Sequence, residues 1–359
     1  MIKILHLDTG LIFRGGQRQV AMLINNLQRF KVRQYLACPD KSPLIDKTYY
    51  TIEHRFPLSR TNFMRFLEKR ELRQFTRANE IDLIHAHDSH SHTLATFLTK
   101  NDLPRLVVTR RSSGKIGFGS RTKYLAHGIK YIAISDHIKK MLISGGVTDN
   151  DVSVISSMID LDHYHSYSDQ AAVSDRPKGR MKIISAGAFD RMKGYHDAVE
   201  AVKILASRRT DFEYMLYGDG PEKEKLVRYI RKNGLEDIVR LPGWQAEPAD
   251  YLRDAHVFVS TSYSEGLNMS IVEAMAAGAA VIATAIPPHK ENIVHEQSGM
   301  LFTPGDTEAL AANLIRLLDD DRLRRNIVEN ARVVAERFDR HEITERIYRL
   351  YCDVVAGDK

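Results

Sequence analysis

Cysteine is scarce in this sequence. The chain of 359 residues carries only two, Cys38 and Cys352. Small secreted domains usually rely on several disulfides, whereas cytoplasmic proteins keep their thiols reduced. Two cysteines cannot supply a disulfide framework, so the sequence predicts a protein of the reducing cytoplasm.

Long hydrophobic runs are also missing. A membrane-spanning helix needs about 20 consecutive apolar residues, and no stretch of the sequence approaches that length. The first apolar segment, residues 1–7, is too short and too interrupted for a signal peptide, and it reads as a strand. We therefore expect a cytoplasmic protein that can contact a membrane only at its inner surface.

Several motifs that would indicate other functions are absent. The G-x-G-x-x-G fingerprint does not follow the first predicted strand, which disfavours a nicotinamide enzyme. No helix-turn-helix, RNP or zinc-finger pattern supports a nucleic-acid-binding protein. Four histidines gather after one predicted strand: His85, His87, His90 and His92. No cysteine lies near them and their spacing matches no common zinc signature, so we expect neither a metal nor another cofactor.

Positive charge is present in excess, but only in one half of the chain. Residues 1–168 hold 25 Lys and Arg against 15 Asp and Glu, whereas residues 169–359 hold 27 against 31. The first half therefore has an excess of ten positive charges and the second an excess of four negative ones. The first half should favour an anionic partner, such as lipid headgroups, a phosphorylated acceptor or nucleic acid.

Short apolar segments alternate with helical patterns along the whole chain. In the first half the expected strands are residues 2–7, 33–38, 51–54, 81–85, 105–109, 131–134 and 152–155. In the second half they are residues 181–186, 212–217, 238–241, 256–260, 279–283 and 299–302. Such alternation predicts parallel sheets covered by helices, the α/β class.

The length of the chain suits two domains rather than one. Residues 156–180 are polar and irregular and form the predicted linker. We expect two Rossmann-like domains, residues 1–165 and 166–340. A last helix within residues 341–359 has an apolar face that could cross back to the first domain or pack on the second.

Residues 265–278, read as EGLNMSIVEAMAAG, are the most informative stretch. They place Glu265 in a loop and Glu273 in a helix, directly after a buried strand, and ligands bind at this end of the strands in open α/β sheets. The intervening amides lie near a helix N-terminus, which favours an anion. This arrangement suits a sugar nucleotide. An alternative is that Ser270 and Glu273 form a capping box that only starts the helix.

Two further regions carry candidate binding residues. Gly15 and Gly16 open the first helix after strand one, where they permit close backbone approach to a ligand or simply form a tight turn. Residues 110–123 combine three glycines with five cations after a predicted strand, and they form either an exposed loop or an anion-recognition loop. On the second interpretation the acceptor-side residues are His87, Arg110, Arg111 and Lys115.

Together these motifs resemble the family 4 retaining glycosyltransferases of the GT-B fold. The resemblance rests on Lys193-Gly194 after the first strand of domain two, on GDGPE at residues 218–222, and on E-x7-E before an AMAAG helix. It spans nearly the whole chain and is strongest over residues 187–306. It implies two Rossmann-like domains that face each other across a cleft, with a nucleotide-sugar donor bound mainly by the second.

The resemblance also implies roles for individual residues. Glu265 would hold sugar hydroxyls, Glu273 the ribose and Lys193 the pyrophosphate. The base would lie near Trp244. The full donor-binding set would be Gly15, Gly16, Gly187, Lys193, Gly218, Trp244, Glu265, Gly266, Leu267, Asn268 and Glu273.

Two positions depart from the family pattern. Ala188 occupies the place of a pyrophosphate-binding arginine, and we expect Arg191 to replace it, so the predicted catalytic residues are Lys193, Glu265 and Arg191. Arg111 occupies the place of a cleft histidine. An arginine that is always charged cannot act as a general base at neutral pH.

The resemblance implies a metal-independent, retaining hexosyltransferase. It would move a sugar from a UDP-, GDP- or ADP-sugar to a hydroxyl of a cell-surface glycan or a lipid-linked acceptor, such as lipopolysaccharide core. The expected partners are this donor, an anionic saccharide or lipid-linked acceptor and the inner-membrane surface, without nucleic acid. Three alternatives stay open: a GT-B sugar-nucleotide epimerase, a phosphorylase, and a basic nucleic-acid-binding protein without catalytic activity.

Overall fold

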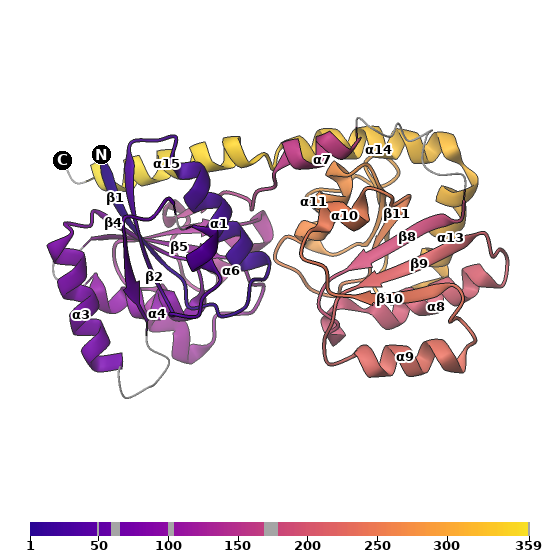
Figure 1. Ribbon diagram of the computed structural model, residues 1–359, viewed down its shortest axis with the longest axis horizontal. Coiled ribbons are helices and arrows are strands. Elements are labelled where there is room, and N and C mark those ends of the chain that lie inside the picture. Colours follow the sequence, from indigo (N-terminus) through magenta and orange to yellow (C-terminus); the bar gives the residue numbers. More distant parts are fainter. Residues whose placement is uncertain (49, 59–64, 100–103, 169–178, 358–359) are drawn as a thin grey trace. The chain divides into compact units, whose positions relative to one another are not determined.

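The computed structural model describes residues 1–48, 50–58, 65–99, 104–168 and 179–357 (Figure 1). Its chain divides into two compact units. Unit 1 comprises residues 1–158 and 340–359, and unit 2 comprises residues 159–339. Each unit contains one parallel sheet with helices, so the predicted α/β class is confirmed.

Unit 1 is built on a seven-stranded sheet with the order β3-β2-β1-β4-β5-β6-β7. Its strands are β1 (Ile2–Leu7), β2 (Val32–Cys38), β3 (His54–Pro57), β4 (Leu83–Ala86), β5 (Arg105–Arg110), β6 (Ile129–Ala133) and β7 (Val152–Val154). Its α-helices are α1 (Gly15–Leu27), α2 (Leu44–Lys47), α3 (Arg65–Ala78), α4 (Ser89–Leu98), α5 (Arg121–Tyr124), α6 (Asp136–Ser144) and α15 (Arg340–Ala356). Every strand pair is parallel, as buried apolar strands separated by helices require.

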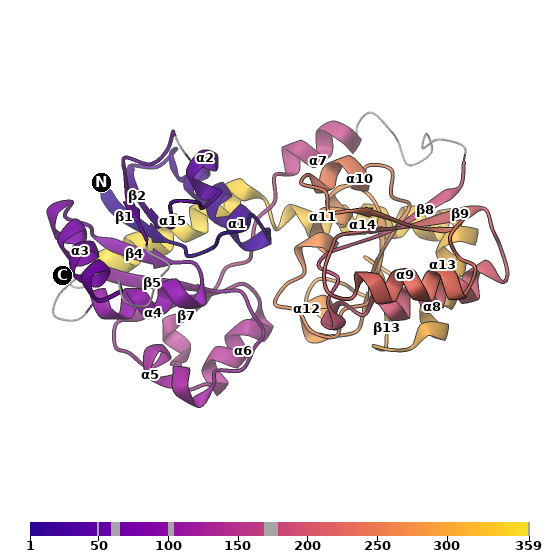
Figure 2. The same cartoon turned by 60° about the horizontal axis from the view of Figure 1, so that its bottom comes forward.

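The last helix, α15, packs on unit 1. Its buried residues Ile343, Ile347 and Tyr351 join one apolar cluster with Ile4 of β1 and Leu83 of β4. Figure 2 shows α15 in yellow beside α1. Unit 1 therefore takes its core from both ends of the sequence.

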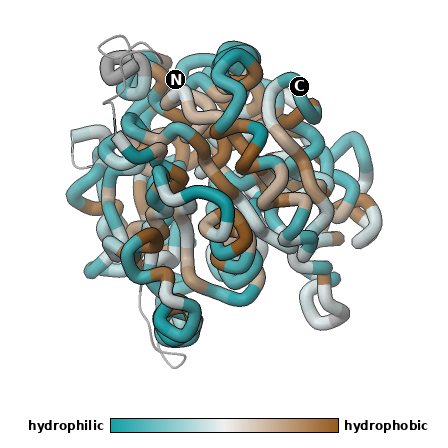
Figure 3. The backbone as a smooth tube through the Cα atoms, turned by 90° about the vertical axis from the view of Figure 1, so that its right-hand side faces the viewer, coloured by the Kyte–Doolittle hydropathy of each residue, from teal (hydrophilic) through white to brown (hydrophobic). Residues whose placement is uncertain are grey.

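Unit 2 contains a six-stranded sheet with the order β10-β9-β8-β11-β12-β13. Its strands are β8 (Met181–Ala186), β9 (Phe212–Tyr217), β10 (Val239–Gly243), β11 (Val257–Ser260), β12 (Ala280–Thr284) and β13 (Met300–Phe302). Its α-helices are α7 (Leu161–Ser168), α8 (Tyr195–Ala206), α9 (Lys223–Lys232), α10 (Pro248–Leu252), α11 (Met269–Ala276), α12 (Pro287–Lys290), α13 (Thr307–Asp319) and α14 (Asp321–Glu336). Hydrophilic and hydrophobic segments follow one another closely along the backbone tube, as expected for elements with one buried face (Figure 3).

Two predictions of local structure were wrong. The predicted linker over residues 156–180 contains helix α7, which packs against α10 and α11, because Leu161 and Tyr164 are apolar enough to be buried. Residues 169–178 of that linker lie outside the described part of the chain. Strand β3 begins at His54, where the predicted strand ended. In the described residues, no helix combines the length and hydrophobicity needed to cross a membrane.

Candidate functional site

Lys193 stands at the end of a short turn that follows strand β8. Asp190 caps this turn, because its carboxylate accepts hydrogen bonds from the backbone nitrogens of Met192 (2.9 Å) and Lys193 (3.2 Å). Gly194 then adopts a left-handed conformation (φ 64°), and a Cβ atom there would lie 2.3 Å from the carbonyl oxygen of Thr261. The loop after β8 therefore fits closely against the segment that follows β11.

The side chains of Lys193 and Glu265 form an ion pair, with 2.6 Å between Nζ and Oε1. Their side chains are 24% and 12% exposed. Glu265 Oε1 also accepts a hydrogen bond from Ser262 Oγ (2.7 Å). These contacts bring together two residues that are 72 positions apart in the sequence and that were both predicted as catalytic. The pair presents a cation and a carboxylate at the carboxyl end of the sheet of unit 2.

Helix α11 begins at Met269, with Asn268 as its N-cap in a left-handed conformation (φ 49°, ψ 76°). The alternative in which Ser270 and Glu273 form a capping box is therefore wrong. The helix starts before Ser270, and Ser270 already lies in its first turn. Glu273 is 8% exposed and lies within the helix. Its predicted contact with a ribose stays a prediction.

The side chain of Asn268 does not cap its own helix. Its Nδ2 atom donates to Ser260 Oγ (2.8 Å) and to His289 Nε2 (3.1 Å). His289, the third residue of α12, was missed by the sequence analysis because a lone histidine beside two prolines matches no binding motif. It is 2% exposed, and burial lowers the pKa of its imidazole to about 4.

The glycines predicted to bind the donor lie in two places. Gly187 and Gly218 follow β8 and β9, and a Cβ atom on Gly218 would lie 1.9 Å from the carbonyl oxygen of Gly187. These two loops are therefore packed too closely for any side chain at position 218. Gly15 and Gly16 belong to unit 1 and open α1. Apart from neighbouring residues and the helix backbone, no described atom lies within 4 Å of a Cβ built on either residue.

The remaining residues that were predicted to bind the donor differ in their exposure to solvent and in the hollows that they line. Trp244 follows β10 and is 62% exposed, whereas Leu267 is buried and Gly266 is half-buried. Arg191 and Lys193 do not line the same hollow. Arg191 lines a separate hollow of about 260 Å³ with Glu222 and Tyr263. A role for Arg191 in binding the pyrophosphate stays a prediction.

The basic loop of unit 1 is partly held by its own contacts. Arg110 donates to Tyr124 OH (2.6 Å) and to the carbonyl oxygen of Gly114. Lys123 donates to Ser89 at the start of α4. Lys115 is exposed. Of the predicted acceptor-side cations in this loop, Lys115 is therefore the best placed to meet a partner.

Arg111 points into unit 1, toward a cluster of three buried histidines: His6, His85 and His87. His6 was missed by the sequence analysis. The order of the strands would have found it, because His6 of β1 pairs in register with His85 of β4. Burial lowers the pKa of His6 to about 4. Burial, then the neighbouring histidines and Arg111, hold the pKa values of His85 and His87 well below 6.5.

The hydrogen bonds of this cluster define its tautomers. Gln34 donates to the carbonyl oxygen of Ile24 (2.9 Å), so its Oε1 accepts from His6 Nε2 (3.1 Å). His6 Nδ1 must then accept from His87 Nε2 (3.0 Å), which leaves the lone pair of His87 Nδ1 buried and without a partner in the described residues. Ligand nitrogens of the three histidines lie within 4.8 Å of one another. The nearby guanidinium of Arg111 opposes a cation there.

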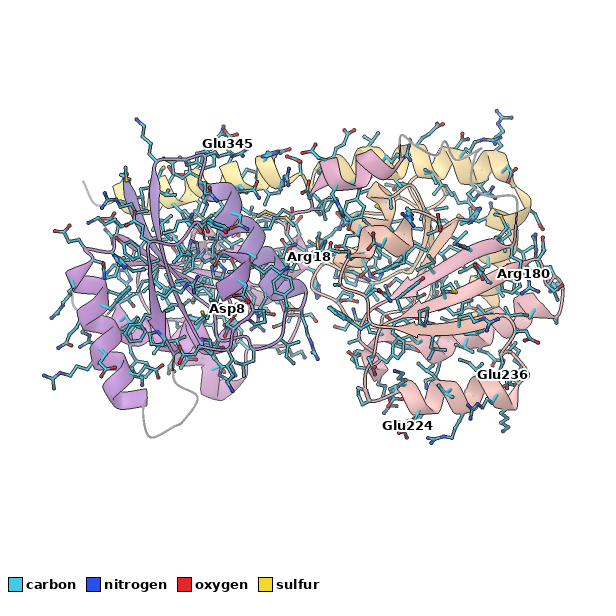
Figure 4. All side chains as sticks on the ribbon, in the orientation of Figure 1. Asp8, Arg18, Arg180, Glu224, Glu236 and Glu345 are labelled. Carbon is cyan, nitrogen blue, oxygen red and sulfur yellow. The ribbon has the colours of Figure 1, made fainter. Side chains whose placement is uncertain are left out.

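Asp8 directly follows β1 (Figure 4), and its carboxylate interacts electrostatically with Arg111. Its carboxylate accepts a hydrogen bond from the backbone nitrogen of Gly10 (2.8 Å). Burial, followed by the charge of Asp88, raises the pKa of Asp8 to about 6. Asp88 in turn accepts from the backbone nitrogen of Thr9 (2.7 Å) and so ties the loop after β1 to the start of α4.

Two family models match the chain, and together they cover most of it. The model described as "Glycosyl transferases group 1" matches residues 167–334. The model described as "Glycosyltransferase Family 4" matches residues 13–163. The boundary between the two matches falls close to the boundary between units 1 and 2.

Individual relatives are distant. The chain is 26% identical over 317 residues to N-acetyl-alpha-D-glucosaminyl L-malate synthase of Bacillus anthracis, covering 80% of this chain and 79% of that protein. It is 31% identical over 182 residues to the lipopolysaccharide core biosynthesis glycosyltransferase LpsD of Rhizobium meliloti (strain 1021), covering 50% of this chain and 52% of LpsD. The crystal structure of Anabaena HepE in complex with UDP has a TM-score of 0.84 at 20% identity, over 98% of this chain and 100% of HepE. That likeness shows a shared fold.

Proposed function

Because this chain belongs to the family 4 glycosyltransferases and has their GT-B fold, we propose that it transfers a sugar from a nucleoside diphosphate sugar to a hydroxyl group. The observation that carries the proposal is the Lys193–Glu265 pair. Lys193 lies in the loop that precedes α8, and Glu265 lies in the loop that precedes α11. The N-cap side chain of α11 donates its hydrogen bonds to residues outside that helix. A cation and the amides of a helix N-terminus suit a diphosphate, and a carboxylate suits sugar hydroxyls.

Lys193 would stabilise the departing diphosphate. Its ammonium group has three donor hydrogens, so it can keep its contact with Glu265 while it donates to a phosphate oxygen. Glu265 would orient the sugar by accepting from its hydroxyls. Because both side chains are mostly buried, solvent weakens these interactions little.

The proposed reaction retains the configuration of the sugar. The bond between the anomeric carbon and the phosphate oxygen lengthens, and positive charge develops on the sugar ring. The acceptor hydroxyl attacks from the face that the diphosphate leaves, and the departing phosphate takes the hydroxyl proton. No protein base is then needed, which agrees with Arg111 in place of the family histidine. Catalysis rests on positioning and on stabilising the diphosphate charge.

Donor binding is tested by a thermal-shift panel of UDP-, GDP- and ADP-sugars with the free diphosphates. A ligand at ten times its dissociation constant stabilises the folded protein by about 1.4 kcal/mol. For a unit of this size that raises the melting temperature by roughly 3–6 °C. Sugar phosphates that carry no nucleoside serve as controls and should give smaller shifts of the melting temperature. No shift with any nucleoside diphosphate would contradict the proposal, and turnover of donor without an acceptor would indicate an epimerase.

The proposed acceptor is an anionic saccharide or lipid-linked saccharide at the inner face of a membrane. The excess of positive charge in residues 1–168 supports it, as does the similarity to a lipopolysaccharide core glycosyltransferase. Among the cations of the basic loop, the exposed Lys115 is the residue proposed to meet the acceptor's charge.

Reversing the charge of Lys115 should weaken acceptor binding selectively. We expect Lys115→Glu to raise the acceptor KM about tenfold, or ~1.4 kcal/mol, and to leave the donor KM unchanged. Steady-state kinetics with each substrate varied in turn measures both constants. Lys31→Glu is the matched control, because Lys31 is exposed and precedes the amino end of β2. Equal rises for donor and acceptor would show that Lys115 does not select the acceptor.

A further inference from the structure

Asn268 adopts a backbone conformation that must be held in place. Its φ of 49° and ψ of 76° lie in the left-handed region, which is unfavourable for a residue with a side chain. The residue immediately precedes α11, so its conformation sets the direction in which the first amides of that helix point. In the proposed donor site, those amides receive the diphosphate.

Two hydrogen bonds from one side-chain amide hold this conformation. Asn268 Nδ2 donates one hydrogen to Ser260 Oγ (2.8 Å) and the other to His289 Nε2 (3.1 Å). His289 can accept at Nε2 only if its proton is on Nδ1. The structure supplies the partner for that proton, because His289 Nδ1 donates to the carbonyl oxygen of Thr284 (2.8 Å).

The same network reaches the residue proposed to hold the sugar. Thr284 Oγ1 donates to the carbonyl oxygen of Ser262 (2.5 Å), and Ser262 Oγ donates to Glu265 Oε1 (2.7 Å). Thr284, Ser262 and His289 are all at most 2% exposed. A buried, fully hydrogen-bonded network of this kind fixes the groups at its ends.

We propose that His289 is a positioning residue of the donor site. Through Nε2 it holds Asn268 in the left-handed conformation, and so it directs the amides at the start of α11 toward the donor diphosphate. The inference rests on the proposed function, and it assigns His289 no contact with the donor. A lowered pKa keeps the imidazole neutral at physiological pH, as acceptance at Nε2 requires.

The first test compares three substitutions of His289 and uses UDP as the probe, with GDP and ADP in parallel. His289→Ala should weaken nucleoside diphosphate binding about tenfold in calorimetry and raise the donor KM by a similar factor, without changing the acceptor KM. In His289→Gln the side-chain oxygen can occupy the place of Nε2, so binding should be largely restored. In His289→Asn the shorter side chain can occupy only the place of Nδ1, so binding should stay weak.

Comparing His289→Gln with His289→Asn distinguishes a positioning role of His289 from a packing role. If His289 only fills space, affinity should follow the melting temperature of each variant, and glutamine should give no selective rescue. That result would overturn the proposal.

A double-mutant cycle with Asn268→Gly gives a second, independent test. Glycine adopts left-handed conformations without a side-chain anchor, so His289 has nothing to hold in this background. Adding His289→Ala to Asn268→Gly should therefore cause no further loss of UDP affinity. Additive losses would show that His289 acts by another route and would overturn the proposal.

The outcomes distinguish this inference from the proposed function. If the wild-type protein binds none of the three nucleoside diphosphates, the donor site and the role of His289 fail together. If the wild-type protein binds one of them and His289→Ala binds it equally well, only the positioning role fails. Should His289→Ala not fold, the comparison of His289→Gln with His289→Asn still decides the question.

Discussion

Replacing Lys193 by methionine is expected to lower kcat by roughly 10²–10³-fold, which corresponds to a barrier increase of about 2.7–4 kcal/mol. Methionine keeps a straight apolar side chain of similar length but lacks the ammonium group. The variant therefore loses the charge that would stabilise the diphosphate as it leaves. Single-turnover kinetics at saturating donor measures this loss separately from donor binding.

Two further variants make the result specific. Lys182→Met is the matched control, because Lys182 also pairs with a carboxylate, Asp254 (3.1 Å), but near the amino end of β8. It should retain nearly full activity. The double variant Lys193→Met, Glu265→Gln tests whether the loss comes only from leaving Glu265 without its cation. A loss smaller than about tenfold for Lys193→Met, or ~1.4 kcal/mol, would exclude the proposed role.

Acidification is expected to destabilise unit 1 between pH 6.5 and pH 4. His6, His85 and His87 have pKa values lower in the folded protein than in the unfolded chain, so the unfolded chain binds more protons in this range. The free energy of unfolding must then fall as the pH falls. The shift of His6 from 6.5 to about 4 alone corresponds to about 3 kcal/mol.

One carboxyl group in unit 1 acts in the opposite direction. The raised pKa of Asp8, about 6, means that the folded protein gains a proton there before the unfolded chain does. On acidification, the stabilisation from Asp8 therefore offsets the destabilisation from about one histidine. His92, whose pKa is lowered to about 3, adds to the destabilisation. His6 and His92 together, less the contribution of Asp8, give a net loss of about 3 kcal/mol between pH 7 and pH 4, and His85 and His87 increase this loss further.

Denaturant unfolding at several pH values measures this effect. Near-ultraviolet circular dichroism follows the whole chain, while fluorescence of Trp244, the sole tryptophan, reports unit 2. His6→Gln should reduce the slope of stability against pH by about 1.4 kcal/mol per pH unit in this range. His90→Gln, at an exposed histidine, should leave the slope unchanged. Unit 1 unfolding that is independent of pH between 6.5 and 4 would refute the prediction.

The sequence predicted the fold well because strands and helices leave strong local patterns. Short apolar segments located every strand of both sheets except β3, which begins where the predicted strand ends. The boundary between the units lies within the predicted linker, but the expectation of irregular structure there was wrong. Helix α7 has few apolar residues, and its burial depends on packing against α10 and α11. Such tertiary contacts leave no periodic signal in the sequence.

Site residues were predictable where a motif spaces them along the chain. Lys193 and Glu265 were found in this way, and the structure places them in contact. His6 and His289 were not found, because each gains its importance from residues distant in sequence, His87 and Asn268. The capping-box alternative failed for a related reason. The local pattern at Ser270 fits a helix start, but the helix had already begun at Met269.

The contribution of α15 to unit 1 has a consequence for how the protein is synthesised. Residues 1–158 leave the ribosome first, but the helix that covers Ile4 and Leu83 follows all of unit 2. At about 5–20 residues per second, the delay is roughly 10–40 s. During that time His85 lacks the hydroxyl of Tyr351, its partner at 2.5 Å, and an apolar surface stays uncovered. Unit 2 can fold as a continuous segment meanwhile, so the second unit in the gene can be the first to reach its native state.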